Sequence, residues 1–150
     1  MSDPQIRATV REDVPAIVAM LAHDPIAAQR ESPDDLAPYY AAFERIAGDP
    51  HQRLVVAARG EQVVGTLQLT LIPGLSRTGM TRSVIEAVRV HHGERGNGLG
   101  TQLIEWAVAE SRRLGCGLVQ LTSDARREDA HRFYERLGFE ASHVGFKKAL

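Results

Sequence analysis

The chain has 150 residues, 43% of them apolar, and its 18 Lys and Arg residues are balanced by 19 Asp and Glu residues. This length and composition predict one globular domain over residues 1–150, with a core large enough to need no disulfide. A single cysteine excludes zinc sites built from several cysteines, and the near-neutral charge argues against nucleic acid as a partner.

The chain opens with a charged segment, because residues 1–11 contain Asp3, Arg7 and Arg11 and have no apolar centre. A secretory signal needs such a centre, and no later segment reaches the roughly 18 apolar residues of a membrane span. We therefore expect a cytoplasmic protein without a membrane partner.

The first half of the chain predicts a strand at residues 6–10 and a helix that begins at Asp13, followed by Pro15. A second helix is expected at residues 34–47. Residues 54–59 and 63–72 are rich in β-branched residues and flank a short turn with Gly60, which predicts a hairpin.

The second half predicts more mixed elements, namely a loop at 73–81, strands at 83–90, 118–122 and 144–149, and helices at 99–114 and 129–137. Strands and helices in this order predict an α/β (α+β) domain. Its central sheet should be mixed, with helices on both faces.

The segment before the helix at 99–114 is rich in glycine and reads Arg95-Gly96-Asn97-Gly98-Leu99-Gly100. Glycines let the backbone approach a ligand, and the first amides of a helix are unpaired donors at the positive end of its dipole. Such a turn favours a phosphate or pyrophosphate. The alternative is a tight turn that only begins the helix.

Two nucleotide-binding motifs do not fit this segment. A Rossmann turn needs a third glycine where Thr101 stands, and an acidic residue near Gln120. A triphosphate-binding P-loop needs a lysine after its last glycine, and the segment has none. The pattern therefore disfavours dinucleotides and nucleoside triphosphates.

Two motifs in order resemble the GNAT superfamily of N-acetyltransferases. Its acetyl-coenzyme A signature, Arg/Gln-x-x-Gly-x-Gly/Ala, is matched by Arg95, Gly98 and Gly100, and its ending, Ala-x-x-Phe-Tyr-x-x-x-Gly-Phe, by residues 130–139. The resemblance implies the GNAT fold, with a mostly antiparallel twisted sheet of about six to seven strands. It also implies acetyl-coenzyme A as cosubstrate, no metal, and direct acetyl transfer to a primary amine of a small molecule or protein. Dimers are common in the family, but no feature of this sequence establishes a homodimer.

The resemblance also implies the cofactor contacts. Backbone groups of Val88 and Val90 would bond the pantetheine arm as an added strand, and the amides of residues 95–101 would hold the pyrophosphate. Arg127 replaces an Asn that is frequent in the family, and its guanidinium could instead reach a phosphate. The implied set is Val88, Arg89, Val90, Arg95, Gly96, Asn97, Gly98, Leu99, Gly100, Thr101, Arg127, Ala130 and Tyr134.

Tyr134 matches the residue that protonates the departing thiolate in the family, a role that suits a phenol with an ordinary pKa of about 10. The alternative is a core aromatic residue beside Phe133. Glu86 is the candidate base that deprotonates the amine. Strand alternation would place it in a row with Val84, Val88 and Val90, and the alternative is a structural ion pair with Arg82.

The acceptor stays open, because two regions favour different amines. The acidic residues in 22–49 favour a cationic amine, whereas Arg77 and Arg82 in 74–83 favour one that carries a carboxylate or phosphonate. Residues 129–134 and 142–150 resemble aminoalkylphosphonate acetyltransferases, but this local similarity carries little weight for the identity of the substrate.

The other reactive side chains have structural interpretations. We expect turn or solvent contacts for His91 and His92, which should point opposite ways on an extended chain, and a packing role for Cys116. A sensor that binds coenzyme A without transferring an acetyl group is the alternative function. Arginines cluster near the two motifs. Phosphate binding would explain this use of arginine, and a general avoidance of lysine is the alternative explanation. They are Arg89, Arg95, Arg126, Arg127, Arg132 and Arg136.

Overall fold

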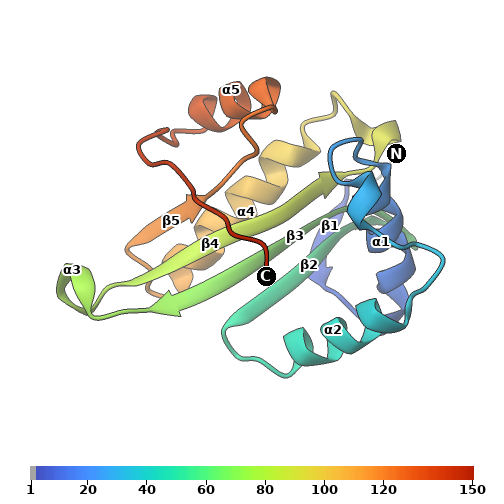
Figure 1. Cartoon of the computed structure of the whole chain (residues 1–150), viewed down its shortest axis with the longest axis horizontal. Coiled ribbons are helices and arrows are strands. Elements are labelled where there is room, and N and C mark those ends of the chain that lie inside the picture. The colour runs from blue at the N-terminus through green and yellow to red at the C-terminus, as the bar shows by residue number, and fades with distance from the viewer. Residues whose placement is uncertain (1–2) are drawn as a thin grey trace.

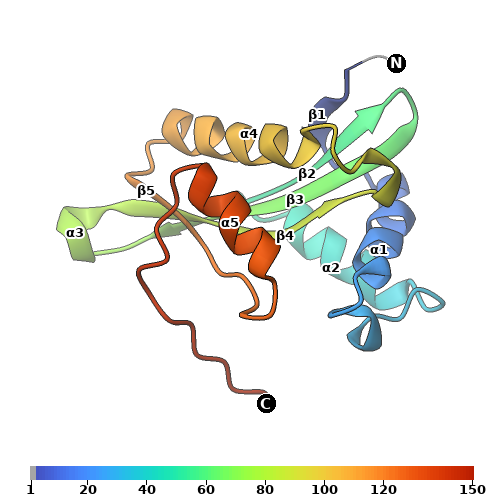
Figure 2. The same ribbon diagram turned by 90° about the horizontal axis from the view of Figure 1, so that it is seen from above.

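The computed structural model describes residues 3–150. Met1 and Ser2, which belong to the expected domain and to the opening segment, lie outside the described residues. A five-stranded sheet has the order β1-β2-β3-β4-β5, and helices cover both of its faces (Figures 1 and 2). Neighbouring strands are antiparallel except for β4 and β5, which are parallel. The predicted mixed α/β architecture is therefore confirmed, with fewer strands than expected.

Most elements follow the predicted order with shifts of up to three residues at their ends, but a short helix at Ser76–Gly79 lies in the segment predicted to be a loop. The strands are β1 (Gln5–Ala8), β2 (Gln52–Arg59), β3 (Gln62–Pro73), β4 (Thr81–Val90) and β5 (Leu118–Leu121). The α-helices are α1 (Val14–His23), α2 (Ala37–Ala47), α3 (Ser76–Gly79), α4 (Leu99–Arg113) and α5 (Glu128–Arg136), and the 3₁₀ turns are η1 (Arg11–Asp13), η2 (Ala28–Arg30) and η3 (His92–Glu94).

The strand expected at residues 144–149 is wrong. Residues 140–150 have no regular structure, and Val144 and Phe146 are 77% and 93% exposed. Alternating apolar residues form a strand only where a neighbouring strand bonds their backbone and another layer covers one face. The tail passes Thr122, the residue after β5, at Gly145, and its end then extends away from the sheet (Figure 2).

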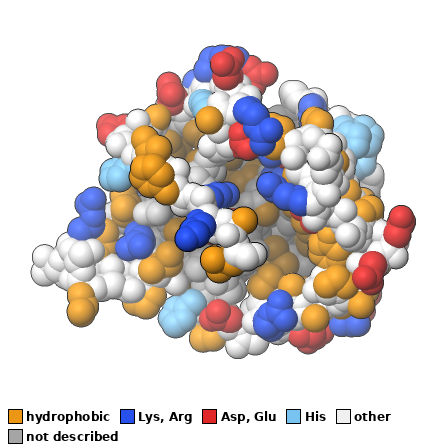
Figure 3. All heavy atoms as spheres, in the orientation of Figure 1, with side chains coloured by type: hydrophobic (Ala, Val, Ile, Leu, Met, Phe, Trp, Pro, Cys, Tyr) orange, Lys and Arg blue, Asp and Glu red, His pale blue; other side chains and the backbone are white. Residues whose placement is uncertain are grey.

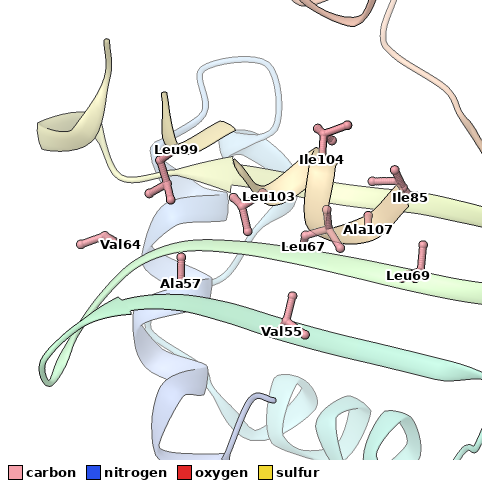
Figure 4. Close-up of a cluster of buried hydrophobic side chains, with 10 residues drawn as sticks. All are labelled: Val55, Ala57, Val64, Leu67, Leu69, Ile85, Leu99, Leu103, Ile104 and Ala107. Atoms are coloured by element: carbon pink, nitrogen blue, oxygen red, sulfur yellow. The ribbon is translucent and has the colours of Figure 1, made fainter. Parts of the chain in front are cut away.

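Two layers of side chains form the core. On one face, α4 packs Leu99, Leu103 and Ile104 against the sheet, in the cluster of Figure 4. On the other face, α1 contributes Ile17 and Met20 to a second cluster. The outer helix on each face, α2 and α5, has no fully buried residue.

A bulge interrupts β4. Thr66 pairs with Arg89 and Gln68 with Glu86, so one β3 residue faces both Ala87 and Val88. Ala87 has a φ of 54°, in the left-handed region that non-glycine residues rarely adopt. The extra residue reverses the alternation of the strand.

The bulge therefore corrects the predicted row of side chains on β4. Val88 and Val90 pack against the core beneath α4. Glu86 and Arg89 share the opposite face, because their partners on β3 line a pocket beside α1 and α2. The expectation that Glu86 lies in one row with Val88 and Val90 is wrong, since simple alternation cannot anticipate a bulge.

Candidate functional site

The C-terminal half of β4, from Glu86 to Val90, has a free edge. Its parallel pairing with β5 ends at Ile85 and Leu121, so no strand within residues 3–150 pairs with it on that side beyond Ile85. His91 N–H donates to the Val64 carbonyl of β3 at 2.8 Å. Because backbone groups alternate along an antiparallel pair, Val88 and Val90 direct theirs to the free edge. The free edge includes Val88 and Val90, the two residues whose backbone groups the family resemblance implied to be unpaired.

The glycine-rich loop leads directly into α4. Gly96 and Gly98 have φ values of 84° and 77°, which a side chain would strain. The N–H groups of Leu99, Gly100 and Thr101 belong to the first helical turn, so they lack intrahelical acceptors and can bind an anion.

Gly100 has a second reason to be glycine. A Cβ there would lie 3.4 Å from Cζ of Phe133 and 4.0 Å from Cγ2 of Val90. The missing side chain lets α5 pack closely against the first turn of α4. The two sequence motifs are therefore in contact in the fold, which the sequence order alone did not require.

A part-buried ion pair connects the glycine-rich loop to the end of β2. Arg59 Nε donates to Glu94 Oε1 at 3.0 Å, and Arg59 Nη2 lies 2.9 Å from the same oxygen. Glu94 is 8% exposed and directly precedes Arg95. Sequence reasoning missed this positioning pair, because its partners are far apart along the chain and only the hairpin brings Arg59 to the loop.

A charged cluster bridges β4, α5 and the segment after α1. Asp24 Oδ2 lies 2.6 Å from Arg127 Nη2 and 3.2 Å from Arg89 Nη2. Arg89 Nη1 also donates to the Val88 carbonyl at 2.9 Å. Asp24 is 8% exposed, and no pattern in the sequence predicts its contact with these arginines. Arg127 thus lies at the free edge of β4, but bound to a carboxylate.

The pKa of Asp24 reflects this cluster. Burial would raise it, but the hydrogen bond from Arg127, the N–H of Ile26 and the charges of both arginines outweigh burial, so the pKa is lowered. Burial also lowers the pKa of Arg89, although the charge of Asp24 opposes this effect. The cluster carries one more positive than negative charge.

The predicted arginine cluster is only partly present. Arg89, Arg95 and Arg127 line one large pocket. Arg126 instead bonds Asp124, and Arg132 pairs with Asp129 on the exposed side of α5. Spacing in the sequence could not separate these groups, because helical position decides which side chains reach the cleft.

Tyr134 lies on α5 between two aromatic rings, with centroids 5.1 Å from Phe133 and 6.0 Å from Phe139. Burial raises the pKa of its hydroxyl, and the charges of Arg89 and Arg127 offset part of this rise. The phenol is therefore protonated at neutral pH. Within residues 3–150 its hydroxyl has no hydrogen-bond partner, so a proton is available for donation.

Two pockets border consecutive residues of β4 at the bulge. The larger, of about 840 Å³, is lined by Val88, Arg89, Arg95 and Arg127 among others. The smaller, of about 120 Å³, lies between α1, α2 and the sheet and reaches Ala87. Figure 3 shows this face hollowed near its centre, with basic side chains on the upper rim and hydrophobic ones below. Consecutive residues of β4 therefore open to spaces of different chemistry.

Glu86 is exposed and precedes the bulge residue Ala87. The ion pairs among residues 3–150 do not include one with Arg82, so the structure does not support the alternative of a structural ion pair. The register places Glu86 opposite Gln68, which lines the smaller pocket. A base at Glu86 would thus stand beside that pocket.

The histidines and the cysteine have structural surroundings. His91 and His92 do not point apart, because η3 stacks their rings at 4.2 Å, and His92 also stacks on His23. The expected turn contact is present, since Gly93 N–H donates to His91 Nδ1 at 3.1 Å. Burial raises the pKa of Cys116, which disfavours a nucleophilic thiolate. Residues 3–150 contain no group of three or more His, Cys, Asp or Glu side chains that could hold a metal ion.

The family comparison agrees with this geometry. The family model described as "Acetyltransferase (GNAT) family" matches residues 16–139. The chain belongs to this GNAT family. The match begins within α1 and includes α2, in the first half of the chain, where the resemblance rests only on element order and the opening from Arg7 to Asp13.

Individual relatives carry different names. The chain is 38% identical over 102 residues to the aminoalkylphosphonate N-acetyltransferase of Salmonella typhimurium, an alignment that covers 68% of this chain and 66% of that protein. It is 40% identical over 80 residues to the glucosamine 6-phosphate N-acetyltransferase of Trypanosoma brucei brucei, which covers 53% of this chain and 52% of that protein. The matches thus span less than two thirds of these curated relatives.

Solved structures match nearly the whole GNAT chain. A transcriptional regulator from Bacillus halodurans C-125 is 44% identical, with a TM-score of 0.95 and coverage of 98% of this chain and 99% of that one. A putative acetyltransferase from Agrobacterium tumefaciens is 25% identical, with a TM-score of 0.84 and coverage of 97% and 99%. These names describe an enzyme and a regulator on one fold.

Proposed function

We propose that residues 1–150 form one N-acetyltransferase domain that moves an acetyl group from acetyl-coenzyme A to a primary amine by direct transfer. The observation that carries this proposal is the combination of three features, namely the free edge of β4, the unpaired amides at the start of α4 and the protonated Tyr134, whose pKa responds to the charges of Arg89 and Arg127 in the larger pocket. Family membership supports acetyl-coenzyme A as the donor.

The residues present fit the donor. The free backbone groups of Val88 and Val90 suit the amides of a pantetheine arm, and the first amides of α4, with Arg95, suit a pyrophosphate. Arg89 and Arg127 supply further positive charge in the larger pocket. Acetyl-coenzyme A brings an activated thioester, and the protein supplies the binding site and the proton transfers.

The transfer assigns one task to each catalytic residue. The amine nitrogen bonds the carbonyl carbon, the carbon–sulfur bond breaks, and the sulfur departs as a thiolate. Glu86 accepts the proton that the amine loses, directly or through water, and Tyr134 Oη gives a proton to the sulfur. The raised pKa of Tyr134 keeps that proton in place.

The matching structure named as a transcriptional regulator supports a second candidate, a coenzyme A sensor without transfer. Isothermal titration with acetyl-coenzyme A, coenzyme A and ATP, combined with an assay of free-thiol release over a panel of amines, separates the candidates. We expect binding of both coenzymes and thiol release with at least one amine. Tight binding with no thiol release would favour the sensor, and binding of ATP alone would contradict both.

We further propose a cytoplasmic protein with no nucleic-acid or membrane partner and no metal requirement. The supporting observations are the near-neutral charge and the finding that no helix in residues 3–150 is long and apolar enough to cross a membrane.

The variant Glu86→Gln tests the proposed role of Glu86 as the base. Its pH–rate profile should lose the acidic limb, and a retained limb would exclude Glu86.

A further inference from the structure

The smaller pocket has a lining that differs from the rest of the cleft. Its volume is about 120 Å³, and its walls are mostly apolar side chains of α1 and α2, such as Val18, Leu21, Ala42 and Phe43. None of the described residues that line it is charged. An apolar cavity of about 150 Å³ in another protein stays dry and binds benzene, so this one has room for a group of a few carbon atoms.

The apolar face of α2 points at this cavity. Tyr39, Ala42, Phe43 and Ile46 recur at the spacing of one helical face and all line it. No residue of α2 is nevertheless fully buried. A helix normally buries such a face against protein atoms, so this face is only partly covered by the protein itself.

The two pockets beside the β4 bulge would take different ligands. The glycine-loop residue Arg95, together with Arg89 and Arg127, borders the larger pocket, which suits a donor with several phosphates. The smaller pocket reaches Ala87, beside the candidate base Glu86. A second substrate that enters there would bring its amine to the bulge from the side opposite the phosphate-binding loop.

We propose that the acceptor is a small primary amine with an uncharged, apolar body that fills the cavity between α1 and α2 and presents its nitrogen at Ala87 and Glu86. This inference rests on the proposed acetyltransferase function and names its substrate class. A phosphonate or carboxylate in the cavity would lose hydration without meeting an oppositely charged partner. The pocket therefore selects against the acceptors that Arg77 and Arg82 had suggested.

The first test is an acceptor series on the wild-type protein. Free-thiol release is measured with acetyl-coenzyme A and ethylamine, propylamine, butylamine or 2-aminoethylphosphonate. We expect kcat/KM to rise about fourfold for each added methylene group, the factor for burying one such group. The phosphonate should react at least about tenfold less efficiently than butylamine.

The second test fills the cavity. Ala42→Leu places a larger side chain in the pocket, and Ala41→Leu, on the exposed side of α2, is the matched control. Ala42→Leu should lower kcat/KM for butylamine at least about tenfold and leave the affinity for acetyl-coenzyme A unchanged. Ala41→Leu should change neither quantity.

The outcomes separate the two levels of the proposal. A flat alkyl series, a preference for the phosphonate, or an Ala42→Leu variant with raised Tm and unchanged kinetics would overturn the apolar acceptor while leaving acetyl transfer intact. No thiol release with any amine would overturn acetyl transfer itself. The alkyl series needs no variant, so it decides the matter even if Ala42→Leu does not fold.

Discussion

The two sides of the β4 bulge differ in how they are built. On the donor side, backbone groups of a glycine loop and a free strand edge face a large basic pocket. On the other side, the helices α1 and α2 enclose a small apolar cavity. In the proposed function, phosphates would bind to fixed backbone donors, whereas an apolar group would bind between α1 and α2, the second of which has no fully buried residue. We infer that backbone groups determine which donor binds, whereas the side chains of α1 and α2 determine which acceptor binds.

The largest expected effect comes from removing the proton donor. Tyr134→Phe should lower kcat at least about 100-fold, the usual lower range for a general acid, because the thiolate would depart unprotonated. The affinity for acetyl-coenzyme A should stay within about twofold, because the ring contacts remain. Single-turnover kinetics and titration calorimetry measure the two quantities. An unchanged rate constant would remove Tyr134 from the mechanism.

The donor side can be weakened by itself. Arg95→Gln should raise the Kd for acetyl-coenzyme A about tenfold, because one charged hydrogen bond to a phosphate is lost. Arg136→Gln, on the exposed side of α5 and outside both pockets, is the control and should leave the Kd unchanged. Equal effects of the two variants in titration calorimetry would mean that only overall charge attracts the coenzyme.

The buried carboxylate between the arginines should matter for stability. Asp24→Asn should lower the free energy of unfolding by about 2 kcal/mol at pH 7, because two part-buried guanidinium groups lose their counter-ion. Asp34→Asn, at an exposed carboxylate, should change it by less than about 0.5 kcal/mol. Urea denaturation measures both.

The same carboxylate predicts a pH dependence. The pKa of Asp24 is lower in the folded protein than its ordinary value, so its stabilising effect is complete above about pH 4 and is lost as the pH falls through the folded pKa. Urea denaturation from pH 7 to pH 3 should therefore show the gap between wild type and Asp24→Asn closing at acidic pH. A gap that stays constant would contradict the ion-pair account.

The bulge itself should have the smallest measurable effect. Ala87→Val places a β-branched residue at a φ of 54°, so we expect a loss of about 1 kcal/mol in the free energy of unfolding. Ala87→Gly should stay close to wild type, because relief of strain offsets the added freedom of the unfolded chain. Equal stability of the Val and Gly variants in urea would show that the left-handed conformation carries no strain.

The sequence predicted the backbone of the glycine loop and the helix that packs beside it well, because its signals there are local. The glycines before α4 report a left-handed loop backbone, and the segment from Ala130 to Phe139 reports the helix that packs on the first turn of α4. The region on the other side of the bulge depends on distant contacts. Neither the bulge at Ala87 nor the approach of Asp24 to Arg127 leaves a pattern in the sequence, because strand register and loop path determine them. The prediction of a strand at Val144 is wrong for the opposite reason, since the apolar pattern is present but the segment is exposed and has no regular structure.

The central claim is that the bulge separates a donor pocket from an acceptor pocket. The most direct measurement is steady-state thiol release by Arg95→Gln and Ala42→Leu, with acetyl-coenzyme A and butylamine varied independently. We predict that Arg95→Gln raises KM for acetyl-coenzyme A alone and that Ala42→Leu raises KM for butylamine alone. If either variant raises both KM values equally, the two pockets act as one and the account is contradicted.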